Sequence, residues 1–242
     1  MVDHPPRLAV LIDADNASAK IVDGLFEEIA KLGEATVRRV YGDFSSPRSR
    51  GWADVLAKHA LIPQQQFAYT TGKNASDITL VIDAMDLLHS GRLDGFCLVS
   101  SDSDFTRLAS RLREDGAVVY GFGEAKTPES FVNACTRFIR TENLIPGTGE
   151  TTPAREPLNR ARTMIERVLS ESDSEDGWIG LGVLGTQLIA LAPDFDARTY
   201  GHKKLLDLVK AINTLEVGSQ NNHHRVRLKP APAKPAAKRA KR

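Results

Sequence analysis

Aspartate residues recur at the ends of apolar runs in the first half of this 242-residue chain. Asp13 and Asp15 follow LAVLI, Asp102 and Asp104 follow GFCLVSS, and Asp77 opens a helical pattern. Because the carboxyl ends of parallel strands line one crevice of an open sheet, we expect these side chains to converge there. Carboxylates gathered so closely raise one another's pKa unless a cation neutralises them. The pattern therefore favours a site for a divalent metal ion.

The ligand chemistry indicates which metal and which reaction to expect. Oxygen ligands without cysteine or spaced histidine pairs favour Mg²⁺ or Mn²⁺ over zinc. Such an ion orients a water molecule and offsets charge during displacement at phosphorus. Phosphodiester hydrolysis is thus the reaction class that fits best.

A structural role is the alternative for each aspartate taken singly. An acidic side chain in the first turn of a helix complements the helix dipole, and short polar side chains cap helices. The coincidence of several aspartates favours the site instead. Asp83 and Asp86 are assigned to the solvated face of their helix and are left out of it.

The elements that must position these residues are visible as alternating patterns from residue 8 to 145. Short β-branched runs alternate with helical spacing, which predicts an α/β fold in which a parallel sheet is covered on both faces, a three-layer domain. Strands are expected at 8–13, 35–42, 64–69, 95–101 and 117–123. Ser76 is expected to cap the helix that ends before Gly91. A final helix is expected to contain Phe131 and Ile139.

The second half of the chain predicts a smaller helical domain. The segment PGTGETTPAREP lacks apolar periodicity and indicates a linker. Three helical patterns and then LEV and RVRL around a polar turn predict a winged-helix arrangement. The basic end KPAPAKPAAKRAKR has no core-forming side chain and is expected to be disordered. The expected division is a domain at 1–145, a linker at 146–157, a winged-helix domain at 158–229 and a tail at 230–242.

Charge supports nucleic-acid binding only locally, because the formal net charge is +1. Lys73 lies in the polar loop TTGKNASD, close to the predicted carboxylates. Lys203 and Lys204 precede the third helix of the second domain, and Arg225 and Arg227 alternate along its hairpin. We expect these five side chains to contact phosphates, with surface solubility as the alternative explanation.

The cellular setting follows from two further features. Cys97 and Cys135 both lie in apolar runs, so reduced, buried thiols are expected. No apolar run is long enough to span a bilayer, and the first residues lack a signal-peptide core. These features predict a soluble cytoplasmic protein that does not bind membranes.

Three strings, LIDADN, KNASD and VSSDSDF, occur in an order that resembles the NYN domain, the LabA-like branch of the PIN-type nuclease fold. The resemblance covers residues 8 to about 145 and implies a PIN-like nuclease. It implies that the acidic metal-binding and catalytic residues are Asp13, Asp77, Asp102 and Asp104. Asn16 and Ser101 would support them, whereas Asp15 occupies a variable position as a candidate helper.

From Gly177 onward the chain is similar to the OST-HTH or LOTUS domain, including the segments PDF, YG and KLLDLV. This resemblance implies a winged-helix fold that binds RNA or a protein partner. Together the two resemblances imply a ribonuclease, most simply an endoribonuclease, that needs Mg²⁺ or Mn²⁺ and acts on single-stranded or structured RNA. A homodimer is left open.

Two other functions compete with this interpretation. One is an RNA-binding regulatory protein whose nuclease fold has weak or no activity. The other is a phosphatase of the haloacid dehalogenase type, because DAD after a first strand also resembles that superfamily. That superfamily places Thr or Val after its D-x-D-x motif, where this chain has Ala17 after Asn16.

Overall fold

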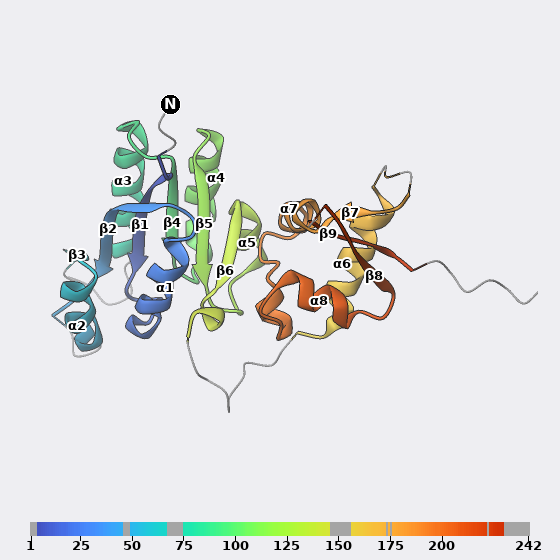
Figure 1. Cartoon of the computed structure of the whole chain (residues 1–242). Helices are drawn as coiled ribbons and strands as arrows, with labels where there is room; N and C mark the ends of the chain where they lie inside the picture. Colours follow the sequence, from blue (N-terminus) through green and yellow to red (C-terminus); the bar gives the residue numbers. More distant parts are fainter. Residues whose placement is uncertain are drawn as a thin grey trace, which may run out of the picture.

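The computed structural model describes residues 4–45, 49–66, 75–145, 156–172, 174, 176–221 and 223–229. Over these residues the chain folds into two units, a larger one with a central sheet and a smaller helical one with a short sheet (Figure 1). The tail at 230–242, Lys73 and all of the predicted linker except Glu156 and Pro157 lie outside the described residues.

The larger unit is built on a six-stranded sheet in the order β3-β2-β1-β4-β5-β6, in which every neighbouring pair is parallel. Its strands are β1 (Arg7–Asp13), β2 (Glu34–Gly42), β3 (Ile62–Gln65), β4 (Gly95–Val99), β5 (Val118–Gly123) and β6 (Arg137–Arg140). The direction of winding reverses between β1 and β4. Loops leaving the carboxyl ends of these two strands therefore diverge and open the crevice in which such sheets bind ligands.

Helices cover both faces of this sheet, so the predicted three-layer α/β architecture is confirmed. One face carries α1 (Val22–Ile29) and α2 (Arg50–Lys58), and the other carries α3 (Ala75–His89), α4 (Thr106–Glu114) and α5 (Glu129–Ala134). Alternate residues of β1 enter the two cores: Leu8, Val10 and Ile12 pack on the first face, and Ala9 and Leu11 on the second. Successive strand side chains point to opposite faces, which is why this strand is apolar throughout.

Short 3-10 helices follow three of the strands and shape the crevice. They are η1 (Ala19–Ile21), η3 (Ser103–Phe105) and η4 (Thr141–Leu144). Gly24 in α1 lets η4 come close, because any side chain at that position would collide with the Leu144 carbonyl oxygen. The segment after β6 can therefore pack closely against α1.

The expected final helix is wrong in its second half. The chain leaves α5 at Cys135, whose backbone is extended, and continues as strand β6. Phe138 packs in one core and Ile139 in the other, which is the period of a strand. Both residues are apolar, so a short buried segment gave the same signal for a helix and for a strand.

Two boundaries also differ from expectation. Ser76 lies inside α3 rather than at its N-cap. The edge strand β3 spans Ile62–Gln65 instead of 64–69, and the last three of those expected positions lie outside the described residues. Polar residues at a sheet edge leave the ends of a strand weakly specified.

The smaller unit has the three helices and the hairpin that the apolar patterns predict. They are α6 (Leu158–Ser170), α7 (Leu181–Leu191) and α8 (Leu205–Ala211), with η5 (Ala197–Tyr200) before the last, and the strands β7 (Ile179–Gly180), β8 (Leu215–Gln220) and β9 (His223–Leu228). Leu184, Leu188, Leu208 and Val226 are fully buried at its centre. The hairpin closes over the helices, as in a winged helix.

The two units meet along β6, the exposed edge of the large sheet (Figure 1). The Phe138 amide donates to the Pro193 carbonyl oxygen at 2.8 Å, which satisfies a backbone group of that edge strand. The Arg140 guanidinium contacts Asp194 at 2.7 Å and Glu156 at 2.6 Å. Charged side chains therefore dominate this contact.

Both cysteines are free and buried, as predicted. Within the described part of the chain, every helix is too short or too polar to cross a bilayer.

Candidate active site at the carboxyl ends of the strands

Asp13 is the last residue of β1, and its side chain is fixed by four hydrogen bonds. Its Oδ1 accepts from the backbone amides of Asp15, at 3.0 Å, and Asn16, at 3.3 Å. Its Oδ2 accepts from Asn16 Nδ2 at 2.9 Å and from Ser100 Oγ at 2.7 Å. Burial raises the pKa of Asp13 above its ordinary value, although these hydrogen bonds oppose the shift. These four hydrogen bonds therefore hold the Asp13 carboxylate in place and satisfy both of its oxygens.

Ser100 connects the ends of β1 and β4. Its hydroxyl donates to Asp13, and the same oxygen accepts the backbone amide of Asp102 at 3.0 Å. The family resemblance implied Ser101 instead, whose Oγ accepts the Glu124 amide at 2.9 Å. The sequence did contain a signal for Ser100, since it directly follows a fully apolar strand. A hydroxyl that is buried at such a position needs a hydrogen-bond partner.

Asp102 lies on the loop after β4, and Asp104 lies in the 3-10 helix η3 that follows. Asp102 caps η3, because its Oδ1 accepts the Asp104 amide at 2.9 Å. The capping role that the sequence allowed is therefore real for Asp102. It leaves the second carboxylate oxygen at the crevice, since Asp102 is partly exposed and Asp104 is exposed.

Asp77 reaches the same place from the first turn of α3. The start of this helix is fastened to the loop after β1, because Ser76 Oγ donates to Asp15 Oδ2 at 2.9 Å. Burial, as the largest cause, and the negative charges of four further aspartates together raise the pKa of Asp77 to about 6. The four aspartates are Asp13, Asp102, Asp15 and Asp104. The fold thus places all five sequence-predicted carboxylates close enough for the other four to raise the pKa of Asp77. We call these five aspartates the acidic cluster.

The donor chemistry of the acidic cluster suits a hard divalent cation, because its only ligands are carboxylate oxygens. Burial is the largest cause of the raised pKa of Asp77, and the repulsion from neighbouring aspartates, which such a cation would relieve, is the second. However, among the described residues no three His, Cys, Asp or Glu side chains are gathered closely enough to hold a metal ion. The partly exposed side chains have room to approach one, whereas Asp13 would have to give up a hydrogen bond.

The same hydrogen bonds argue against the phosphatase alternative. That chemistry requires the first aspartate to attack phosphorus with an available oxygen lone pair. Both oxygens of Asp13 already accept two hydrogen bonds each, and the residue is 1% exposed.

Asp83 was assigned to a solvated helix face, and this is wrong. Its Oδ2 accepts from Arg39 Nη1 at 2.7 Å and from the Tyr41 hydroxyl at 2.8 Å. Both partners lie on β2, so Asp83 fixes α3 to the sheet and thereby positions Asp77 at its first turn. Asp86 is exposed, as expected.

The predicted phosphate contacts of the second unit differ in their surroundings. Lys203 and Lys204 are exposed beside α8. In the hairpin, the guanidinium groups of Arg225 and Arg227 each lie 4.5 Å from the centre of the Trp178 ring. Arg227 also pairs with an acidic side chain of β8 at 2.8 Å. These two arginines therefore already have partners within their own domain, and the two lysines are the more accessible cations.

Comparison with known proteins gives two family matches. The model of the NYN domain matches residues 7–142, and the model of the OST-HTH/LOTUS domain matches residues 156–226. No curated protein is similar enough to count as a relative. Among solved structures, the chain resembles the crystal structure of a protein of unknown function from Vibrio parahaemolyticus, with 19% identity and a TM-score of 0.48. The match covers 57% of this chain and 94% of the other.

Proposed function

We propose, from the premise that the chain belongs to the NYN domain family, that it hydrolyses RNA phosphodiester bonds at the acidic cluster with the help of Mg²⁺ or Mn²⁺. The observation that carries this proposal is the placement of Asp77 among four other aspartates. The OST-HTH/LOTUS match over 156–226 supports RNA as the nucleic acid. Together the two family matches support a role on RNA.

The proposed division of labour follows from burial and hydrogen bonding. Asp77, Asp102 and Asp104 have access to solvent and would hold the cation together with Asp13. When bound, the ion would polarise the phosphate and lower the pKa of a water molecule. Asn16 is the fifth participant, because its backbone and side-chain amides keep Asp13 in place.

The second domain would recruit the substrate through exposed cations. Lys203 and Lys204 are suited to phosphate contacts, which give affinity without reading sequence and weaken as salt is raised. A cytoplasmic location, a homodimer and a protein partner of this domain stay predictions.

Cleavage of labelled RNA tests the proposal directly. Purified full-length protein is incubated with a single-stranded RNA and with a hairpin RNA, in Mg²⁺, in Mn²⁺ and in EDTA. We expect cleavage only with metal, and its loss in Asp102→Asn and Asp77→Asn. Asp86→Asn is the matched control, because Asp86 lies on the same helix as Asp77 and is exposed. Cleavage that persists in EDTA or in Asp102→Asn would refute the site.

RNA binding without turnover is the second candidate function. It is favoured by the absence of a ready-made group of three metal ligands among the described residues. Tight binding of both RNAs, without cleavage in either metal, would establish this function in place of hydrolysis.

A further inference from the structure

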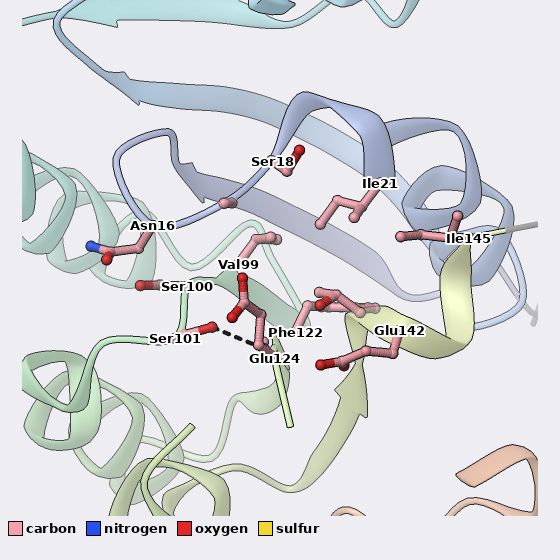
Figure 2. A pocket seen from close by; sticks show the side chains of 13 residues that line it. Asn16, Ser18, Ile21, Val99, Ser100, Ser101, Phe122, Glu124, Glu142 and Ile145 are labelled. Carbon is pink, nitrogen blue, oxygen red and sulfur yellow. Dashed lines mark hydrogen bonds between the residues drawn. The ribbon is translucent and has the colours of Figure 1, made fainter. Parts of the chain in front are cut away.

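A cavity adjoins the acidic cluster, between the carboxyl ends of β4 and β5 and the 3-10 helices η1 and η4 (Figure 2). Its volume is about 160 Å³, which is below the roughly 300–1,000 Å³ of sites for drug-sized ligands, so it would hold one small group at most. Asn16 and Ser100 line it, and both donate hydrogen bonds to Asp13. A group bound in the cavity would therefore lie directly beside the proposed site of hydrolysis.

The walls of the cavity suit a flat, uncharged ring. Four of its lining residues are large and apolar: Ile21, Val99, Phe122 and Ile145. Among the described residues that line it there is no lysine, arginine or histidine, whereas Glu124 and Glu142 are both present. Figure 2 shows these two glutamates on one side of the cavity, with Ser18 and Ile21 on the other. Glu124 is already paired with Lys126 at 2.7 Å, so Glu142 is the carboxylate that remains to accept N–H donors from a bound base.

Glu142 carries an acceptor that the protein does not satisfy. Its Oε1 accepts the Ala125 amide at 2.8 Å, but its Oε2 is buried without a hydrogen-bond partner. Such an oxygen is unfavourable until a donor reaches it. The terminal torsion of a glutamate is soft, so a small turn brings this oxygen to the cavity surface. Gly24 allows η4, which contains Glu142, to pack closely against α1.

We propose, building on the nuclease function above, that this cavity binds the base of the nucleotide beside the cleaved phosphate and that Glu142 selects guanine. Guanine is the base that presents two adjacent N–H donors, at N1 and at the exocyclic amine, to an ionised carboxylate, which only accepts. The apolar walls pack against the faces of the ring. Adenine and inosine each offer Glu142 fewer donors along the same edge.

Binding of short RNAs tests the proposal without requiring cleavage. The probes are fluorescein-labelled single-stranded RNAs that differ only in a central guanine, inosine or adenine, and their affinity for the full chain is measured by anisotropy in EDTA. We expect the guanine probe to bind about tenfold more tightly, within the range that a good bidentate base contact gives. Glu142→Gln should abolish this preference, because an amide nitrogen then replaces one acceptor oxygen. The amide oxygen still accepts from Ala125, and the exposed Glu114→Gln is the matched control.

The outcomes separate this proposal from the nuclease function. Equal affinity of the wild-type chain for the guanine and inosine probes overturns the proposal. This test needs no variant, so the proposal can be refuted even if Glu142→Gln does not fold. A guanine preference that survives Glu142→Gln also overturns it, because the preference then arises elsewhere in the chain. If cleavage in Mn²⁺ does not depend on the central base, the proposed guanine site is refuted and the proposed nuclease function is retained. A preference that depends on Glu142, without cleavage in Mn²⁺, supports the pocket and overturns the nuclease.

Discussion

Replacing Asp77 with asparagine is expected to stabilise the metal-free protein while removing its proposed activity. Taken whole, a shift of the pKa from 3.8 to about 6 corresponds to roughly 3 kcal/mol of unfavourable free energy at neutral pH. Because Asp77 is partly exposed, solvent screening reduces this to about 1.5 kcal/mol. Loss of a negative charge in the first turn of α3 removes about 0.5 kcal/mol of helix-dipole stabilisation. The net gain should be about 1 kcal/mol.

Thermal unfolding in EDTA measures this gain. For a domain of this size, about 1 kcal/mol raises the Tm by roughly 3 °C. Addition of Mg²⁺ or Mn²⁺ should stabilise the wild-type chain, because a ligand that binds only the folded state shifts the equilibrium by mass action. It should stabilise Asp77→Asn much less, and Asp86→Asn should behave like the wild type in both measurements.

The direction of the Asp77 pKa shift also predicts how the stability difference between the wild type and Asp77→Asn depends on pH. Below the ordinary pKa of 3.8, Asp77 is protonated in the folded and unfolded states alike, so the wild type and Asp77→Asn should differ little. Between 3.8 and about 6 the folded state binds the proton more tightly, so wild-type stability falls as pH rises. The advantage of Asp77→Asn should therefore appear over this interval and be complete above it. A variant that is less stable than the wild type at pH 7 in EDTA would refute the repulsion argument.

Two further substitutions test how the site and the domains are held. Ser100→Ala removes the hydroxyl that connects Asp13 to the end of β4. Denaturant unfolding should show a loss of about 1–2 kcal/mol in the free energy of unfolding, and RNA cleavage should be reduced. An unchanged free energy of unfolding would mean that this hydrogen bond does not stabilise the protein. Arg140→Ala removes one of the two cations that Glu156 and Asp194 share, and Arg160 still pairs with both acids, so unfolding should show a loss of about 1 kcal/mol and the second domain should become more sensitive to proteolysis. An Arg140→Ala chain as protease-resistant as the wild type would show that the domain contact does not depend on this residue.

The sequence predicted the sheet because its central strands β1 and β4 are apolar on both faces, and it placed Asp13 and Asp102 because they lie at or shortly after the ends of those strands. The sequence-based prediction failed at residues whose type is compatible with two different local structures or environments. Ile139 fits a buried helix as well as a buried strand, and only its pairing with β5 decides between them. Asp83 looks like a surface residue until the packing of α3 places it beside Arg39 and Tyr41. Ser100 was missed because its value lies in a hydrogen bond between segments 87 residues apart.

These contacts explain how the fold tolerates five carboxylates in one crevice. The repulsion falls on Asp77, and it acts to push the first turn of α3 away from β1. Two sets of interactions oppose it: the Asp83 pairing with β2 and the Ser76 hydrogen bond to the loop after β1. Hydrogen bonds to charged groups contribute roughly 1.5–3 kcal/mol each, which is at least as large as the free energy worked out above for burial and repulsion of Asp77 together. These contacts therefore hold α3 beside β1 without a cation, and the carboxylates of the acidic cluster would still have to move closer together to bind one.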